Sequence, residues 1–229
     1  LHPEHTGDVL YEGKKLNIKD VAAQIKNGFA LVPEDRQSQG LIQTLDIGKN
    51  TAISSMKDYV KGLFLDEKAE NAAVDEQIKD IHIKVADKRL PILSLSGGNQ
   101  QKVVIGKGLL TKPKILLLDE PSRGIDIGAK TEVFEIIHDL AEKGLSIIVI
   151  SSELKEIMAI ADRIVVLSNG KKTGELNIRD ATKDELISRM VGRDLTDMYP
   201  KETIPIGDEI LRVEGLETDY VKDISFSTR

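Results

Sequence analysis

Two carboxylates, Asp119 and Glu120, directly follow the apolar run at residues 115–118. Such a run is typical of a buried strand, and open α/β sheets bind ligands at the carboxyl ends of their strands. There, one carboxylate can hold Mg²⁺ while its neighbour orients or deprotonates an attacking water. The pair therefore indicates hydrolysis of a phosphate compound, whereas an isolated Asp-Glu entering a loop would be two solvated acids.

A candidate phosphate site precedes this strand, at Ser96, Gly97 and Gly98. Ser96 can cap the helix predicted over residues 99–110, and glycines let backbone N–H groups approach an oxygen. The helix dipole favours negative charge at the same place. From these three residues alone, an ordinary helix cap with a flexible Gly-Gly is an equal alternative.

Hydrophobic periodicity supplies the elements that must position these groups. Apolar runs predict buried strands, and three- to four-residue spacing predicts amphipathic helices, which together indicate a parallel sheet flanked by helices. Asn169-Gly170 predicts a type I′ hairpin turn. The expected strands are at residues 29–33, 115–118, 146–150, 164–167, 172–176, 209–213 and 221–226; the expected helices are at 18–26, 99–110, 130–143 and 182–191, with an exposed helical lobe at 50–90.

Composition excludes several classes of protein. The 229 residues carry 32 basic and 38 acidic side chains, a net charge of -6 with interspersed signs, so a general footprint for nucleic acid is absent. The absence of cysteine excludes a disulfide scaffold and a thiolate metal site. No apolar run is long enough to span a bilayer, and the first residues do not have the pattern expected of a signal peptide.

Longer motifs resemble the ATP-binding cassette (ABC) ATPases, in particular the second cassette of the tandem ATPases of bacterial ribose, galactose and xylose importers. The resemblance covers nearly the whole chain. It rests on the signature segment (residues 95–102, LSGGNQQK), the acidic segment (115–120, ILLLDE), the D-loop segment (123–126, RGID), the EDR segment (34–36, EDR) and the switch segment (151–153, SSE).

The resemblance implies a P-loop NTPase-like three-layer α/β core with a mostly parallel sheet, a helical subdomain at about residues 50–105 and a small antiparallel β element. It also implies ATP and Mg²⁺ as cofactors. Ser96, Gly97 and Gly98, with Asn99 and Gln100 of the same segment, would contact the γ-phosphate of a nucleotide held by a partner cassette.

The other implied roles concern the metal and the attacking water. Asp119 would serve Mg²⁺, and Glu120 would be the catalytic carboxylate. Glu34 stands where the family has a glutamine that senses Mg²⁺, and Ser152 stands where the family has its switch histidine. Two further roles are implied: Asp126 would lie across the dimer seam, and Tyr220 would lie near the adenine.

Three departures from the family pattern matter. Glu34 replaces the glutamine, and the Ser152 hydroxyl cannot replace an imidazole in polarising a γ-phosphate. The largest departure is the phosphate loop, because none of the Gly-Lys pairs continues as G-x-x-x-x-G-K-[ST]. These pairs begin at Gly13, Gly48, Gly106 and Gly170.

The resemblance thus suggests a fragment that runs from just past one P-loop to just short of the next, with Leu1 rather than Met at its start. Residues 1–200 would be an ATPase domain without its P-loop. Residues 201–229 would be a linker and the first strands of a second, or the same permuted, nucleotide-binding domain. The region around residues 190–201 resembles the linker of a first cassette instead.

The expected function is that of the ATP-hydrolysing subunit of an ABC transporter for a monosaccharide, with this chain alone inactive. Its partners would be a second nucleotide-binding domain, permease subunits and, indirectly, a sugar-binding protein, but no nucleic acid. It would lie peripherally on the cytoplasmic membrane face.

Two alternatives stay open. One is a non-hydrolytic regulatory cassette that supplies its signature segment in trans. The other is a soluble cassette ATPase of DNA repair or translation. No metal site is expected at the histidines, which lack metal-spaced neighbours and are expected at the surface: His2, His5, His82 and His138.

Overall fold

The computed structural model describes residues 7–17, 20–191 and 207–229. It divides the chain into two compact units. The first consists of Leu1–Ile164 and Glu175–Asp180, and the second of Val165–Gly174 and Ala181–Arg229. Among the described residues, no helix combines the length and apolarity needed to cross a bilayer.

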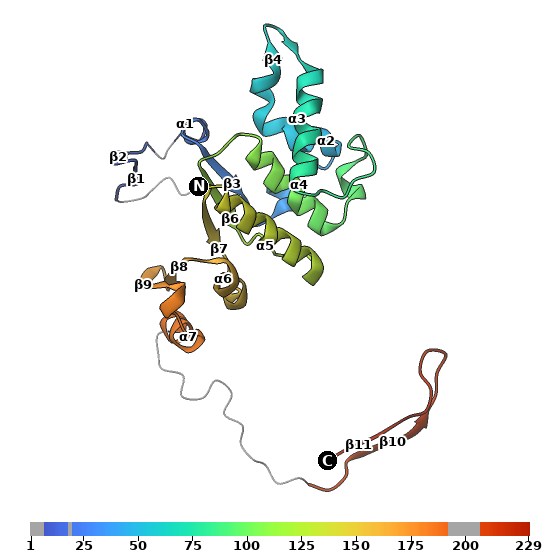
Figure 1. Cartoon of the computed structure of the whole chain (residues 1–229). Coiled ribbons are helices and arrows are strands. Elements are labelled where there is room, and N and C mark those ends of the chain that lie inside the picture. The colour runs from blue at the N-terminus through green and yellow to red at the C-terminus, as the bar shows by residue number, and fades with distance from the viewer. Residues whose placement is uncertain (1–6, 18–19, 192–206) are drawn as a thin grey trace. The chain divides into compact units, whose positions relative to one another are not determined.

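A three-stranded parallel sheet forms the centre of the first unit, which confirms the prediction from alternating strands and helices. Strand β6 (Ile115–Asp119) pairs in parallel with β3 (Phe29–Val32) on one side and with β7 (Ser146–Ile150) on the other (Figure 1). Leu118 lies opposite both Val32 and Val149. The loops that follow the three strands therefore leave from the same edge of the sheet.

One face of this sheet is covered by helices α4 (Gly97–Leu109) and α5 (Ile127–Glu142). Helix α5 buries apolar residues at three- to four-residue spacing, as an amphipathic helix does, whereas α4 is buried at every position from 100 to 106. The resulting core consists mainly of Ala30, Val32, Leu116 and Leu118 from the sheet and Val103, Val104, Val133, Ile136 and Ile137 from the helices. This packing fixes β6, and with it the position of Asp119 and Glu120.

The opposite face of the sheet stays largely uncovered by the described residues. Because side chains alternate along a strand, Leu31, Ile148 and Ile150 point away from α4 and α5, and they are 61%, 55% and 57% exposed. Strand β7 is also an edge strand, pairing only with β6 in the described part of the chain. Parallel sheets are normally buried on both faces, so an apolar face and the β7 edge of this sheet lack the neighbour expected of them among the described residues.

The helical lobe contains α2 (Ile47–Ala52), the turn η2 (Ile53–Tyr59) and α3 (Glu67–Asp80). Asn50 is 1% exposed; its side chain accepts from the Ile42 N–H at 2.7 Å and donates to the Ile42 carbonyl at 3.0 Å. A hairpin of β4 (Val60–Lys61) and β5 (Phe64–Leu65) interrupts the helices. The sequence pattern did not predict this hairpin.

Shorter elements complete the chain. Asn169 and Gly170 have φ angles of 50° and 72°, as the predicted turn between β8 (Arg163–Ser168) and β9 (Lys171–Asn177) requires. Strands β10 (Leu211–Leu216) and β11 (Ile224–Thr228) pair antiparallel. The domain boundary predicted near residue 200 falls outside the described residues. The remaining elements are β1 (Leu10–Tyr11), β2 (Lys14–Lys15), α1 (Val21–Lys26), η1 (Arg36–Gly40), η3 (Ile92–Ser94), α6 (Leu154–Ile160), η4 (Ile178–Asp180) and α7 (Lys183–Val191).

A buried lysine joins α4 to α5. Lys102 is 2% exposed, and its Nζ donates to Glu132 Oε2 at 2.7 Å and to the His82 carbonyl at 2.9 Å. Lys84 Nζ donates to the other Glu132 oxygen at 2.6 Å. Hydrogen bonds from Lys102 and then Lys84 lower the pKa of Glu132 to about 2. The ammonium of Lys102 is therefore neutralised by a carboxylate at an almost completely buried position.

Replacing Glu132 by glutamine is expected to destabilise the chain by about 2 kcal/mol near neutral pH, because the buried Lys102 ammonium loses its carboxylate. The folded-state pKa of Glu132 lies below the ordinary value of 4.5, so the carboxylate stabilises the fold above about pH 4.5. That stabilisation is lost as the pH falls toward 2. Urea unfolding at about pH 7 and about pH 3.5 measures both effects.

The Glu132→Gln variant should lose less stability between these two pH values than the unmodified chain does. Glu135→Gln, on the exposed side of the same helix, is the matched control and should behave like the unmodified chain. The same pH dependence in both variants would contradict the assignment.

Candidate functional site

Asp119 and Glu120 lie half-buried at the carboxyl end of β6, as predicted. Glu120 has a φ angle of 45°, in the left-handed region that non-glycine residues seldom adopt. Its N–H donates to the Ile150 carbonyl at 2.8 Å, and its Oε1 accepts from the Ser152 N–H at 2.8 Å. The chain thus turns sharply after β6, and the Glu120 carboxylate is held by the residues that follow β7.

Ser152 contacts Glu120 through its backbone and not through its hydroxyl. A backbone N–H is available from any residue except proline, so this contact does not depend on the side-chain type. The structure therefore brings the predicted switch residue to the predicted catalytic carboxylate. The contact is made by the backbone N–H of Ser152, which could not be inferred from the type of its side chain.

Glu156 of α6 was not singled out from the sequence, although it organises the same region. It is 6% exposed and accepts hydrogen bonds from Ser122 Oγ at 2.7 Å, Lys130 Nζ at 2.8 Å and Ser151 Oγ at 3.0 Å. Burial raises its pKa, but the hydrogen bonds from Lys130, Ser122 and Ser151 outweigh burial and leave the pKa lowered. Glu156 thereby ties together the segments that follow β6 and β7.

The predicted cap at the signature segment is present. Ser96 caps α4, and its Oγ accepts from Asn99 Nδ2 at 3.1 Å. A Cβ atom at Gly97 would lie 2.9 Å from Arg36 Nη2, and one at Gly98 would lie 2.4 Å from the Ala129 Cβ. Close packing therefore requires a glycine at position 98, whereas a side chain at position 97 would displace the Arg36 guanidinium; the sequence pattern supplied neither reason.

Asn99 and Gln100, the other predicted ligands of the signature segment, direct their side chains into the protein. Asn99 Oδ1 accepts from the Lys84 N–H at 2.8 Å. Gln100 is 5% exposed, donates to the Leu95 carbonyl at 3.2 Å and accepts from Gln37 Nε2 at 2.5 Å. These two side chains stabilise the conformation of the signature segment. The groups of the segment that remain to bind an anion are the Ser96 hydroxyl and the first backbone N–H groups of α4.

The remaining predicted residues are placed separately. Glu34 forms an ion pair with Arg123 of the D-loop segment, so the structure joins these two segments. Asp126 caps α5, with its Oδ1 accepting from the Ala129 N–H at 2.9 Å. Tyr220 belongs to the second unit and is 96% exposed in the loop between β10 and β11.

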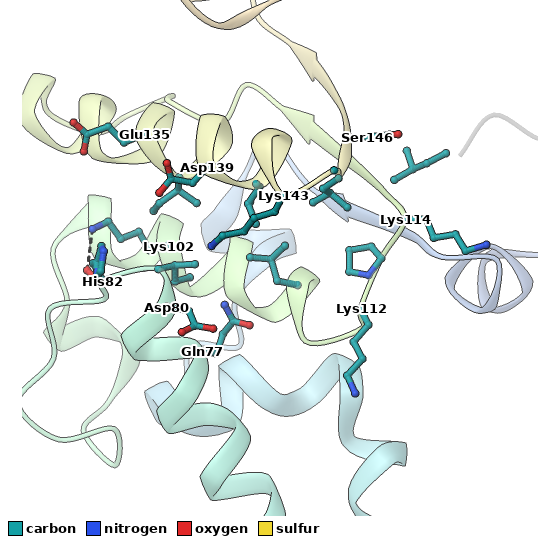
Figure 2. A pocket seen from close by; sticks show the side chains of 18 of the residues that line it. Gln77, Asp80, His82, Lys102, Lys112, Lys114, Glu135, Asp139, Lys143 and Ser146 are labelled. Carbon is teal, nitrogen blue, oxygen red and sulfur yellow. Dashed lines mark hydrogen bonds between the residues drawn. The ribbon is translucent and has the colours of Figure 1, made fainter.

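A cavity of about 1100 Å³ lies between α3, α4 and α5 and reaches Ile115 and Ser146 (Figure 2). Those two residues begin β6 and β7, so the cavity adjoins the amino ends of the strands. Lysines and carboxylates alternate around it, including Lys102 and Asp139. Asp119 and Glu120 are at the opposite end of the strands, and the cavity is therefore separate from the predicted site.

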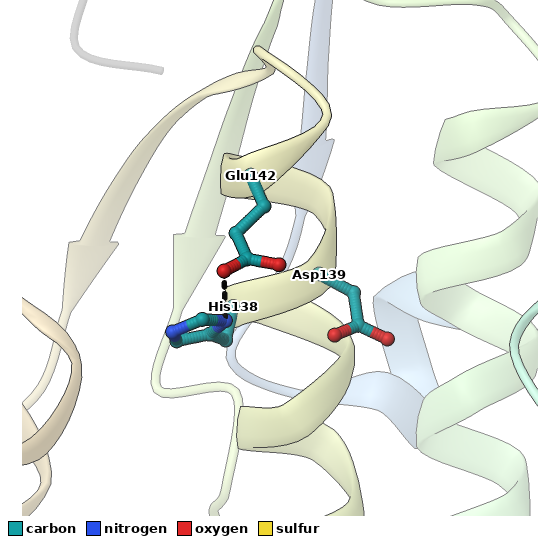
Figure 3. Close-up of side chains that lie close together, drawn as sticks. All are labelled: His138, Asp139 and Glu142. Atoms are coloured by element: carbon teal, nitrogen blue, oxygen red, sulfur yellow. Dashed lines mark ion pairs between the residues drawn. The ribbon is translucent and has the colours of Figure 1, made fainter.

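His138 was expected at the surface, and it is 67% exposed by side chain. The expectation that it lacks a metal-spaced carboxylate was wrong. One helical turn places Glu142 beside it, with 3.8 Å from His138 Nδ1 to Glu142 Oε1, and Asp139 is adjacent (Figure 3). All three side chains are exposed on α5. His82 is also exposed, and His2 and His5 lie outside the described residues.

Comparison with known proteins decides the family. The family model described as "ABC transporter" matches residues 1–123. The xylose import ATP-binding protein XylG of Pseudomonas savastanoi pv. phaseolicola is 40% identical over 184 residues, which are 80% of this chain and 36% of that protein. The chain belongs to the ABC transporter family. The ribose import ATP-binding protein RbsA of Oceanobacillus iheyensis is 41% identical over 186 residues, 81% of this chain and 38% of RbsA.

Solved ABC structures confirm the predicted fold class. The cassette MJ1267 superposes with a TM-score of 0.68 at 21% identity and covers 80% of this chain and 76% of its own. The cassette MJ0796, in a state described as post-hydrolysis with ADP and Pi, gives 0.64 at 22% identity and covers 77% and 75%. By contrast, the chain spans only 36% to 38% of the length of the XylG and RbsA relatives above.

The contact between Glu120 and Ser152 predicts a local exchange effect. Glu120→Ala should speed hydrogen exchange of the Ser152 amide by about tenfold to a hundredfold, since a hydrogen bond to a charged group contributes about 1.5–3 kcal/mol. Ser152→Ala should leave the amide at position 152 protected, because the hydroxyl does not make the bond. Exchange followed by NMR tests both variants, and an unchanged rate in Glu120→Ala would contradict the contact.

Proposed function

We propose that this chain is part of the ATP-binding and ATP-hydrolysing subunit of an ABC transporter that imports a monosaccharide. The observation that carries the proposal is the carboxyl edge of the sheet, where Asp119 and a restrained Glu120 meet the switch segment. The similar proteins XylG and RbsA are import ATP-binding proteins for xylose and ribose, which favours a pentose or a related sugar. The same similarity favours transport over DNA repair or translation.

The donor set at this edge fits Mg²⁺ and an attacking water. Mg²⁺ prefers oxygen ligands and is commonly bound by one or two carboxylates together with waters and phosphates, which suits Asp119. When bound, the ion would neutralise charge on the phosphates. Glu120 would orient the water and accept its proton, and the Ser152 N–H holds the Glu120 carboxylate for that task. Glu34 would reach the metal only after releasing Arg123.

The nucleotide site also needs a P-loop, and the 229 residues do not contain one. The uncovered face of the sheet supports the proposal that the P-loop belongs to a segment outside these residues. The apolar face at Leu31, Ile148 and Ile150, and the β7 edge that pairs with no other described strand, would accept a strand and a helix carrying G-x-x-x-x-G-K-[ST]. The relatives' much greater length is consistent with such a segment.

In the assembled transporter, the Ser96 hydroxyl and the N-terminus of α4 would face the γ-phosphate held by a second nucleotide-binding domain. Asp126 would lie at the interface of that dimer. Closure of the dimer would be transmitted to the permease subunits through the helical lobe and the EDR segment. A sugar-binding protein would act indirectly, through the permease. The subunit would then lie peripherally on the cytoplasmic face of the membrane.

A second candidate function is that of a non-hydrolytic cassette that supplies the signature segment in trans. Two observations favour it: the missing P-loop and the Ser152 side chain, which offers no imidazole. Both candidates use Ser96, but only the first requires Glu120 to act chemically.

A chimera separates the two candidates. The chain is joined behind the P-loop segment of the XylG relative, and Mg²⁺-dependent ATP hydrolysis is measured. We expect turnover that Glu120→Gln lowers by about 10²- to 10⁴-fold, the usual contribution of a general base. Glu135→Gln, an exposed carboxylate on α5 outside the site, is the control and should change the rate little. ATP binding without turnover in a folded chimera would favour the regulatory candidate.

A further inference from the structure

Arg36 makes an unusual contact with the backbone of the D-loop segment. Its Nη1 donates to the Arg123 carbonyl at 2.6 Å, and its Nη2 donates to the Gly124 carbonyl at 2.9 Å. One planar guanidinium thus binds two consecutive carbonyl groups, a geometry that a lysine ammonium cannot reproduce. This pair of hydrogen bonds, here called the fork, joins the EDR segment to the D-loop segment, which follow different strands.

A second ion pair links the same two segments in the opposite direction. The Arg123 guanidinium pairs with the Glu34 carboxylate. Arg123 and Glu34 are 64% and 46% exposed, so water screens this pair and it contributes little alone. Arg36 is the more enclosed partner, since its Nε is buried without a hydrogen-bond partner in the described structure. The contact to the D-loop segment therefore depends mainly on Arg36.

The signature segment is the third neighbour of the same guanidinium. A Cβ at Gly97 would lie 2.9 Å from Arg36 Nη2 and 3.4 Å from the Gly124 carbonyl oxygen. The residue after Arg36 extends the connection, because Gln37 Nε2 donates to Gln100 Oε1 of α4 at 2.5 Å. Arg36 therefore occupies the junction of three segments that come from three separate parts of the chain.

We propose that Arg36 is a positioning residue that fixes the D-loop segment against the signature segment. A movement of the EDR segment would then displace both together and would present Ser96 and Asp126 to a partner cassette as one surface. This consequence rests on the proposed function. The clamp formed by Arg36, Gly97 and the D-loop segment is a property of the chain itself.

Hydrogen exchange by mass spectrometry on the 229-residue chain, without nucleotide or partner, tests the clamp. Arg36→Lys keeps the charge but loses the fork, so exchange in residues 121–127 should accelerate about tenfold while residues 115–119 of β6 stay unchanged. Gly97→Ala should reproduce the pattern by displacing the guanidinium. Arg89→Lys is the matched control, because Arg89 makes an exposed bidentate pair with Asp87 in the helical lobe.

Unchanged exchange in residues 121–127 in both Arg36→Lys and Gly97→Ala would overturn the proposal. A uniform acceleration that includes β6 would also overturn it, since that result would make Arg36 a general stability residue. Because this assay contains no nucleotide, its failure leaves the proposed function standing.

A second measurement addresses positioning. The labelled chain is titrated with ATP in the presence of an intact P-loop cassette of the family, and complex formation is followed by fluorescence anisotropy. Arg36→Lys should raise the half-saturating ATP concentration about tenfold at an unchanged plateau, whereas Arg89→Lys should not. An unshifted midpoint in Arg36→Lys would overturn the positioning role. No complex with the unmodified chain would contradict the proposed function while leaving the clamp standing.

Discussion

The parallel, in-register pairing of β3, β6 and β7 is the constraint on which the candidate site depends. Val32, Leu118 and Val149 lie at the same level, so the three loops that follow them leave the sheet side by side. These loops carry the EDR segment, the acidic and D-loop segments and the switch segment. Residues far apart in the sequence are thereby brought within hydrogen-bond reach, as Glu34 with Arg123 and Glu120 with Ser152 illustrate.

Buried charges then fix how these loops are shaped. Glu156 accepts hydrogen bonds from residues of three different segments, and Lys102 joins the two helices beneath the sheet. A buried ion is costly unless every oxygen or proton has a partner, so each cluster favours one arrangement of its neighbours. The Glu120 carboxylate is oriented by a backbone N–H at the end of β7, and the position of that N–H depends on the neighbouring Ser151–Glu156 contact.

Much of this arrangement is predictable from sequence, because hydrophobic periodicity and strand ends are local signals. The runs before Pro33 and Asp119, and the cap at Ser96, identified the sheet edge and the start of α4. The hairpin β4–β5 was missed because two-residue strands give too short a pattern. Helix α6 was missed because it begins without a side-chain cap.

The contacts of Glu156 and Arg36 could not be predicted, because they join positions distant in the chain. Nothing in the local sequence shows that Gly97 must make room for a guanidinium or Gly98 for a methyl group. The exposed Leu31 and Ile148 could not be distinguished from core residues either. They are exposed because no described element packs on their face of the sheet, and a local sequence pattern carries no information about that.

We propose that this chain provides the carboxylates and the signature segment of a nucleotide site whose P-loop lies outside it. Equilibrium binding of a fluorescent ATP analogue with Mg²⁺ is the decisive measurement. We expect no saturable binding to the isolated chain at millimolar nucleotide. We expect saturable binding that depends on Ser96 when an intact P-loop cassette of the family is added. Micromolar binding by the isolated chain, unaffected by Asp119→Ala, would contradict the proposal.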